Sequence, residues 1–241
     1  MVKFQNVSFS YDGEHPVLED LSFTINKGEA VGLIGANGAG KSTIMNLLLG
    51  LLKGSGEIFV EGLPVNKENL PQIRQKIGFV LQNSDNQMFM PTVYEDMIFG
   101  PLNYGLSREE AEQRVDKVLD MLGLQALKHR HNHKISGGEK RMAAIATILA
   151  MEPEMIVMDE PSTALDPVNR RRVINTINSL PQTKLIASHD LDMILDTCQR
   201  VLLISRGKIV ADGDAEAVLL DKALLEANQM ELPLCIQGWQ R

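Results

Sequence analysis

A glycine-rich loop between a short apolar strand and a helix constrains the fold of this chain most strongly. The predicted strand Ala30–Ile34 runs into the sequence GANGAGKST, and a helical pattern follows. This order matches G-x-x-x-x-G-K-[ST], in which backbone N–H groups and a helix N-terminus enclose a phosphate. We expect Lys41 to reach the terminal phosphates of a nucleotide and the hydroxyl of Ser42 to bind Mg²⁺. The loop consists of Gly35, Ala36, Asn37, Gly38, Ala39, Gly40, Lys41, Ser42 and Thr43.

A second apolar strand ends in two acidic residues. Met155–Met158 is followed directly by Asp159 and Glu160. A phosphate loop needs a nearby carboxylate to hold Mg²⁺, and an apolar strand of the same parallel sheet delivers Asp159 to that place. Glu160 is suited to orient a water for attack on the γ-phosphate. A strand that simply leaves the core at an acidic pair is the alternative, and the presence of the phosphate loop disfavours it.

A serine and two glycines precede a predicted helix that contains Arg141. Small residues and free N–H groups at a helix start form an anion site. A subunit that already has a complete phosphate loop has little use for a second one. The motif therefore predicts a contact with the nucleotide of a partner subunit. It consists of Ser136, Gly137, Gly138 and Glu139.

Charge and cysteine content limit the class of protein. The chain carries 31 acidic and 24 basic residues, a net charge of −7. Proteins that grip nucleic acid usually present a basic face, so we expect no nucleic-acid partner. Cys198 and Cys235 match no metal or redox spacing, which favours a reducing compartment. The apolar stretches are far shorter than the ~20 residues that span a bilayer, and no secretory signal opens the chain.

Short β-type runs alternate with helical patterns, which predicts an α/β fold. Several runs are almost uninterrupted apolar segments, as in parallel strands that are buried on both faces. The segment from about 83 to 134 interrupts the alternation with mainly helical sequence, which predicts an inserted helical lobe. The remaining predicted elements are the strands Leu21–Ile25, Ile77–Leu81 and Leu185–Ala187, a hairpin over Val201–Ala211, and helices over Ser107–Leu122 and Arg141–Leu149.

Together these motifs resemble the ATP-binding-cassette family, and the resemblance covers nearly all of residues 2 to 220. The phosphate loop, the Ser136–Glu139 motif and the Asp159–Glu160 pair stand in the family's order. The resemblance implies one ATP-binding domain over residues 1–241 that hydrolyses ATP with Mg²⁺. It also implies a P-loop NTPase core with a mainly parallel sheet, an N-terminal antiparallel β subdomain, a helical subdomain at about 83–134 and a C-terminal tail at 221–241.

Four further residues match family positions. The resemblance implies that Gln82 senses Mg²⁺ and the attacking water, and that His189 contacts the γ-phosphate. It implies that Tyr11 stacks on adenine and that Asp166 belongs to a loop that couples two subunits. Each has a structural alternative: an edge-strand aromatic for Tyr11, a solvated strand-end amide for Gln82 and a helix-capping residue for His189.

A narrower resemblance follows Gln82. The sequence QNSDNQ, then PTVYED and FGP, is similar to the ATPases of energy-coupling-factor importers, which take up cobalt, nickel or vitamins. The ATP-binding-cassette family most often has Leu and Gln where this chain has Ile135 and Glu139, so both residues depart from the family pattern. A generic cassette importer with a similar loop is the alternative.

The resemblance implies a peripheral protein on the cytoplasmic face of the cell membrane. Two copies, or this chain and a related ATPase, would sandwich ATP and Mg²⁺ and drive a transmembrane coupling protein that works with a substrate-binding membrane protein. A soluble cassette ATPase that acts on ribosomes or DNA is disfavoured by the acidity and by the single cassette. A phosphotransferase that shares only the phosphate loop would leave Ser136–Glu139 and Ser162–Asp166 unexplained.

Two segments stay open. His129, His131 and His133 alternate ahead of Ser136, and on a strand they would share one face. A metal site and a solvated linker are both compatible with that run, and no carboxylate or cysteine joins it. Near the C-terminus, Trp239 and the apolar run at 232–234 either dock on a partner or belong to a loosely packed tail.

Overall fold

The computed structural model describes residues 1–237, so Trp239 lies outside the described residues. Contacts divide the chain into two compact units. The first unit consists of Met1–Arg74 and Pro181–Arg241, and the second unit is Gln75–Leu180. Both units combine strands with helices, which confirms the α/β prediction. The predicted helical lobe at 83–134 lies within the second unit.

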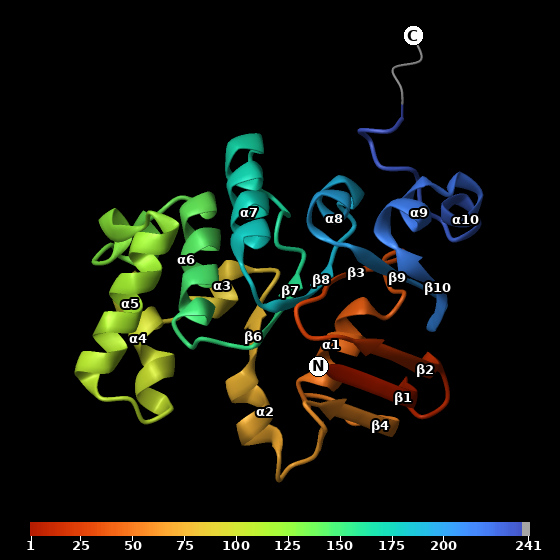
Figure 1. Cartoon of the computed structure of the whole chain (residues 1–241), viewed down its shortest axis with the longest axis horizontal. Coiled ribbons are helices and arrows are strands. Elements are labelled where there is room, and N and C mark those ends of the chain that lie inside the picture. The colour runs from red at the N-terminus through yellow and green to blue at the C-terminus, as the bar shows by residue number, and fades with distance from the viewer. Residues whose placement is uncertain (238–241) are drawn as a thin grey trace. The chain divides into compact units, whose positions relative to one another are not determined.

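An antiparallel sheet of four strands opens the first unit. Its strand order is β2-β1-β4-β5, and Figure 1 shows β1, β2 and β4 side by side. The buried residues include Val2, Phe4 and Val7 of β1 and Leu21, Phe23 and Ile25 of β2. Phe4 stacks on Phe23 with ring centroids 4.5 Å apart. The strands are β1 (Val2–Ser10), β2 (Pro16–Ile25), β4 (Ser55–Val60) and β5 (Leu63–Pro64).

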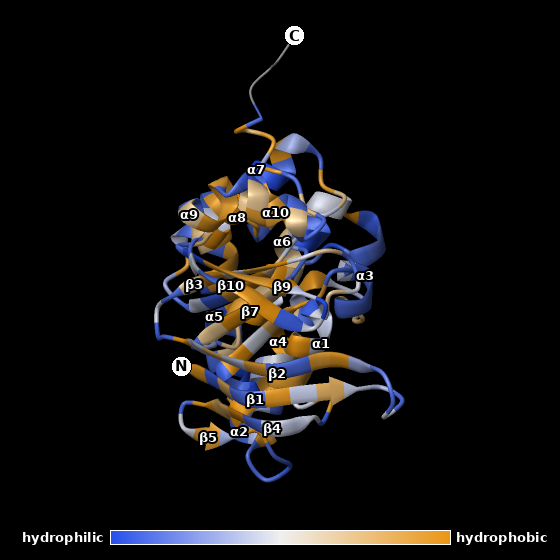
Figure 2. Cartoon of the chain, turned by 90° about the vertical axis from the view of Figure 1, so that its right-hand side faces the viewer, coloured by the Kyte–Doolittle hydropathy of each residue, from blue (hydrophilic) through white to orange (hydrophobic). Residues whose placement is uncertain are grey.

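Parallel strands form the rest of the first unit's core. Strand β3 (Ala30–Ile34) pairs in parallel with β8 (Thr183–Ala187) on one side and with β9 (Arg200–Ser205) on the other. Every residue of β3 and β8 is buried, as expected for strands covered on both faces. Figure 2 shows the hydrophobic colouring of β3 and β9. The helices of this unit are α1 (Lys41–Leu48), α8 (Leu191–Thr197), α9 (Ala215–Leu220) and α10 (Lys222–Ala227), and α2 (Leu70–Lys76) begins in it.

The predicted hairpin is present. Strand β10 (Lys208–Asp214) pairs antiparallel with β9. The two residues between them, Arg206 and Gly207, have φ values of 48° and 75°. Positive φ at both positions is typical of a tight turn that matches the twist of the flanking strands.

The second unit packs helices beside two parallel strands. Strand β6 (Ile77–Val80) pairs with β7 (Met155–Asp159) in register from Ile77 and Met155 onward. Strand β6 is one residue shorter than predicted, and β7 is one residue longer. Figure 1 shows α4, α5 and α6 side by side. The helices are α3 (Ser84–Gln87), α4 (Val93–Asn103), α5 (Arg108–Leu122), α6 (Gly137–Leu149) and α7 (Pro167–Ser179), with short 3-10 turns at Gln125–Leu127 and Asn132–Lys134.

Reciprocal capping boxes fix the starts of α4, α5 and α6. In the predicted helix α5, the Ser107 side chain accepts from the Glu110 N–H, and the Glu110 carboxylate accepts from the Ser107 N–H at 2.9 Å. Thr92 and Glu95 do the same for α4. Each box satisfies amide donors that have no partner inside the helix.

Asp96 of α4 organises the turn that precedes this helix. Its side chain is buried, and Oδ1 accepts from the N–H groups of Phe89 and Met90 at 3.1 Å each. The side-chain amide of Asn132 donates to the other carboxylate oxygen. Burial raises the pKa of Asp96 despite these hydrogen bonds. The carboxylate therefore ties the segment after α3 to the turn that contains Asn132.

We expect Asp96→Ala to lower the free energy of unfolding by about 2 kcal/mol, because partly buried N–H groups lose their acceptor. Denaturant unfolding measures the change. Asp116→Ala is the control, since Asp116 pairs with Lys128 at 2.5 Å on a more exposed surface and such pairs contribute ~0–1 kcal/mol. Equal losses in the two variants would contradict the role given to Asp96.

None of the helices in the described part of the chain combines the length and the apolar character needed to cross a bilayer.

Candidate functional site

The glycine-rich loop of the first unit requires glycine at two positions by its geometry. Gly35 and Gly40 have φ values of 151° and 113°. A Cβ on Gly35 would lie 2.2 Å from the carbonyl oxygen of Ile204, and one on Gly40 would lie 2.5 Å from Cδ2 of Leu18. The backbone of β9 therefore passes where a side chain at position 35 would stand, and the side chain of Leu18 occupies the corresponding place at position 40. Positive φ at these glycines gives the loop the tight backbone turn that a phosphate-binding loop requires.

The helix that follows the loop has a start suited to an anion. Gly40 is the N-cap of α1 and makes no side-chain cap, and no acidic residue occupies the first turn. Lys41 is 8% exposed, and its Nζ donates to the carbonyls of Gly35 at 2.6 Å and Ala36 at 3.1 Å. The lysine is thus folded over its own loop. An uncapped helix start beside a cationic group fits a polyphosphate such as that of ATP.

Tyr11 reaches this loop from the turn between β1 and β2. Its hydroxyl lies 3.3 Å from Oγ1 of Thr43, its ring packs edge-on against Phe9, and it is 66% exposed. Tyr11 therefore stands just past β1, beside the first turn of α1, with a large part of its ring available to a base. Tyr11 follows the last residue of β1 and does not lie within an edge strand, which was the alternative for this residue.

His189 lies at the same strand edge as the loop. Its strand, β8, pairs in parallel with β3 in the register Leu33 to Ala187, so the carboxyl ends of both strands meet at one edge. The imidazole is exposed. Asp190, and not His189, is the N-cap of α8, because its side chain accepts from the Met193 N–H at 3.0 Å. The helix-capping alternative for His189 is therefore wrong.

A small hollow of about 170 Å³ adjoins the loop in the first unit. Ala36 to Ala39 line one side of it. Ser205 at the end of β9, Arg206 of the β9–β10 turn and residues 227–229 at the end of α10 line the remainder. No motif in the sequence indicated that the segment after α10 reaches the phosphate loop, since turn residues and helix ends of this composition are common.

In the second unit, the two residues of the acidic pair differ in position and in burial at the end of β7. Asp159 is the last strand residue and is partly exposed, whereas Glu160 lies outside the strand and is 7% exposed. Glu160 adopts φ 48°, and Thr163 Oγ1 donates to its carboxylate at 3.3 Å. A left-handed glutamate is uncommon and costs backbone strain. A buried carboxylate in a fixed turn does not fit a strand that leaves the core at an acidic pair.

The Ser136–Glu139 motif begins α6 as a capping box. The Ser136 side chain accepts from the Glu139 N–H, and the Glu139 carboxylate accepts from the Ser136 N–H at 2.8 Å. These hydrogen bonds lower the pKa of Glu139. The motif also packs against the residues after β7: a Cβ on Gly138 would meet the side chain of Asn169, whose Nδ2 donates to Asp166 at 2.5 Å. Asp166 is the N-cap of α7.

Gln82 lies two residues beyond β6, with an exposed side chain. Its carbonyl accepts from the guanidinium of Arg141 at 2.5 Å, and the carbonyl of Leu81 accepts from the same group at 2.7 Å. Arg141 was predicted only as part of an apolar helix, and its contact with these two carbonyls is seen only in the structure. The only sequence feature that pointed to it was a basic residue at the start of an otherwise apolar helical segment.

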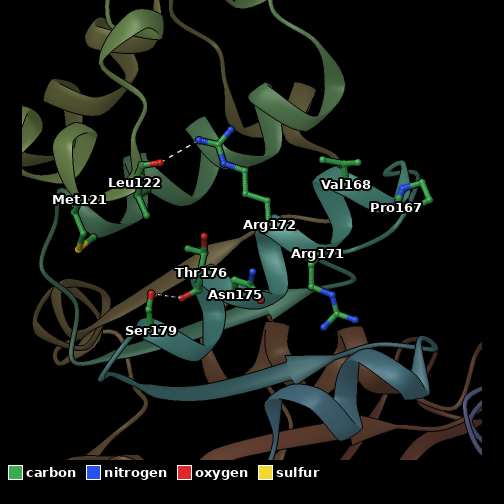
Figure 3. Close-up of a pocket in the computed structure, with 9 residues that line it drawn as sticks. All are labelled: Met121, Leu122, Pro167, Val168, Arg171, Arg172, Asn175, Thr176 and Ser179. Atoms are coloured by element: carbon green, nitrogen blue, oxygen red, sulfur yellow. Dashed lines mark hydrogen bonds between the residues drawn. The ribbon is translucent and has the colours of Figure 1, made fainter.

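The three histidines do not share a strand face. His131 precedes the 3-10 turn Asn132–Lys134 and His133 lies within it, with their ring centroids 5.4 Å apart, while His129 packs near the ring of Tyr94. Within residues 1–237, no three or more His, Cys, Asp or Glu side chains gather as metal ligands would. A separate groove of about 680 Å³ lies between α7 and the end of α5. Figure 3 shows the residues that line it, Arg171 and Arg172 among them.

Comparison with known proteins identifies the family. The family described as ABC transporter matches residues 18–163. A protein of Streptomyces avermitilis described as an ABC transporter ATP-binding protein is 46% identical over 94% of this chain and 87% of its own. The energy-coupling factor transporter ATP-binding protein EcfA of Methanothermobacter thermautotrophicus is 41% identical, covering 97% of this chain and 77% of its own.

A solved structure agrees with the fold. CbiO1 of Clostridium perfringens, described as part of the ABC transporter complex CbiONQ, superposes with a TM-score of 0.85 at 32% identity, over 94% of this chain and 93% of that one. The glycine-rich loop, the uncapped helix and the lysine above it fit the nucleotide that such cassettes use. The chain belongs to the ABC transporter family and is an ATP-binding subunit that hydrolyses ATP with Mg²⁺.

Proposed function

We propose that the chain is the motor subunit of an energy-coupling-factor importer for a transition-metal ion such as cobalt or nickel, or for a vitamin. The observation that carries this is the similarity to EcfA along 97% of the chain. The similarity to CbiO1 of the CbiONQ complex supports the same assignment. The chain would act on the cytoplasmic face of the cell membrane through membrane-spanning partners.

We assign the nucleotide roles as follows. Backbone N–H groups of the glycine-rich loop and Lys41 bind the phosphates, and Tyr11 stacks on adenine. Ser42 and Asp159, with Gln82, hold Mg²⁺, which when bound screens the charge of the phosphate oxygens. The remaining loop residues Asn37, Gly38, Ala39 and Thr43 complete the cradle.

Hydrolysis then depends on three side chains of this subunit. The Glu160 carboxylate accepts a proton from the attacking water, which becomes a stronger nucleophile toward the γ-phosphate. Gln82 helps to orient that water, and the His189 imidazole donates a hydrogen bond to a γ-phosphate oxygen as negative charge develops there. The low exposure of Glu160 supports its role, because a dry site strengthens electrostatic contacts.

A second subunit completes each ATP site. We assign Ser136, Gly137, Gly138 and Glu139 to the nucleotide of a partner, which is a second copy or a related ATPase. Asp166 belongs to the same contact, since Asn169 joins it to Gly138. ATP favours the closed dimer only insofar as it binds that state more tightly than the open one.

An exposed apolar cluster in the segment after Gln82 supports docking of the transmembrane coupling protein. Phe89 and Phe99 are 63% and 41% exposed and pack edge-on with centroids 5.1 Å apart. Leu102 and Tyr104 of the same segment are also exposed. Exposed aromatic clusters of this kind mark protein interaction sites. We assign helices of the coupling protein to this surface.

We expect Phe89→Glu to reduce the membrane-bound fraction of the chain about tenfold, because a charge replaces an exposed aromatic side chain that docking would bury. The tagged protein is expressed in its native host, and membrane and soluble fractions are quantified. Met121→Glu is the matched control, since Met121 is 57% exposed in the same unit but lies on α5. ATPase activity of the purified proteins should be alike. Equal membrane binding of Phe89→Glu and the unmodified chain would contradict this docking surface.

A further inference from the structure

Arg141 is a buried cation whose hydrogen bonds end on backbone carbonyls. It is 5% exposed. Its two terminal nitrogens donate to the carbonyls of Leu81 at 2.7 Å and Gln82 at 2.5 Å, and among residues 1–237 its Nε has no hydrogen-bond partner. Burial lowers the pKa of its guanidinium. No carboxylate in the described part of the chain pairs with it.

A buried charge without a counterion is costly to stability, so its position calls for a reason other than packing. Strand β6 ends at Val80, so the carbonyls of the next two residues lie beyond its ladder with β7. The planar fork of a guanidinium can hold two successive carbonyls at once, whereas an ammonium is a point charge. Arg141 therefore sets the backbone direction at Gln82.

Other side chains tie the same segment to the same helix. Gln87 accepts from the Leu81 N–H at 3.0 Å, and its Nε2 donates to the Ala144 carbonyl of α6 at 2.7 Å. Lys140 of α6 pairs with Asp85. Residues 81–87 are thus attached to α6 at three points.

Helix α6 also begins with the Ser136–Glu139 motif, whose Gly137 is its first residue. Arg141 lies four residues further on, about one helical turn. One rigid helix therefore carries both the motif assigned to a partner's nucleotide and the cation that holds Gln82. A displacement of this helix start would be passed to Gln82 through the guanidinium.

We propose that Arg141 is a positioning residue for ATP hydrolysis, which holds Gln82 in its working place and links it to the Ser136–Glu139 motif. This inference rests on the role proposed for Gln82. Arg141 acts through the backbone of Gln82 and does not itself contact ATP.

The first test measures the backbone without nucleotide. Hydrogen exchange is followed in Arg141→Lys over peptides that cover residues 77–90. We expect exchange to accelerate at least about tenfold at 82–87, because that segment loses a tether. Arg172→Lys is the matched control. As Figure 3 shows, Arg172 reaches the Leu122 carbonyl at the end of α5, at 3.0 Å, so the control removes a similar contact elsewhere in the unit.

The second test separates positioning from general stability. In Arg141→Lys we expect kcat to fall about tenfold while ATP affinity stays within about twofold. In the Gln82→Ala background the same change should reduce kcat by less than about twofold, because residues that act through one another are not additive. If Arg141→Lys fails to fold, Gln87→Met replaces it, with the same expected direction and the same non-additivity.

The outcomes are distinct. Full additivity with Gln82→Ala, or unchanged exchange at 82–87 in the Arg141 variant, would overturn the inference and leave the role of Gln82 intact. Unchanged turnover in Gln82→Ala alone would remove the role of Gln82 and the inference with it.

Discussion

Glu160→Gln is expected to bind ATP with affinity close to that of the unmodified chain and to lose at least about 100-fold in kcat. Glutamine has almost the shape of glutamate, so the buried turn with φ 48° keeps its packing and its contact with Thr163. It cannot accept a proton from water at neutral pH. Steady-state turnover and equilibrium ATP binding measure the two expectations separately.

Glu154→Gln is the control for this variant. Glu154 stands before the same strand, β7, and its carboxylate pairs with Lys76 at 2.7 Å. We expect it to change turnover by less than about twofold, because a partly exposed ion pair contributes little to stability. Normal turnover in Glu160→Gln would remove Glu160 from the role of base, whatever the control shows.

Lys41→Ala is expected to weaken ATP binding by about 100-fold, which corresponds to about 2.7 kcal/mol. The variant removes a cation that is folded over the glycine-rich loop, where its Nζ donates to the carbonyls of Gly35 and Ala36. Charge-assisted hydrogen bonds to phosphate are the strongest contacts such a loop offers. Isothermal titration with ATP and Mg²⁺ measures the affinity.

Lys53→Ala controls for the loss of a positive charge in the same unit, because Lys53 is exposed and follows α1. Its affinity for ATP should match that of the unmodified chain. An affinity of Lys41→Ala within about twofold of the control would contradict the assignment of the phosphate site.

The sequence predicted the elements whose pattern is strictly local. The strand β3, the loop after it and the capped helix α5 were all predicted within one residue, since each has its own periodicity, glycines or capping pair. The ends of β6 and β7 each differ by one residue from the prediction. The ladder between β6 and β7 stops at Val80 and Met158, and no local feature of the sequence marks that point.

What the sequence could not predict depends on contacts between distant segments. Glu160 has a left-handed backbone conformation, which its residue type did not predict, because glutamate rarely adopts positive φ. Arg141 looked like one charge in an apolar helix, because nothing in its neighbours reveals that its partners are carbonyls about sixty residues earlier. The alternation of His129, His131 and His133 suggested a strand face, yet a 3-10 turn breaks that alternation.

Copurification from native membranes tests the importer assignment most directly. The tagged chain is isolated from detergent-solubilised membranes of its native host, and the proteins that accompany it are identified and quantified by mass spectrometry. We predict stoichiometric recovery of a small integral coupling protein and a substrate-binding membrane protein, together with a second copy of this chain or a related ATPase. Recovery of soluble proteins or ribosomes alone would contradict the motor-subunit assignment, although the ATPase chemistry would stand.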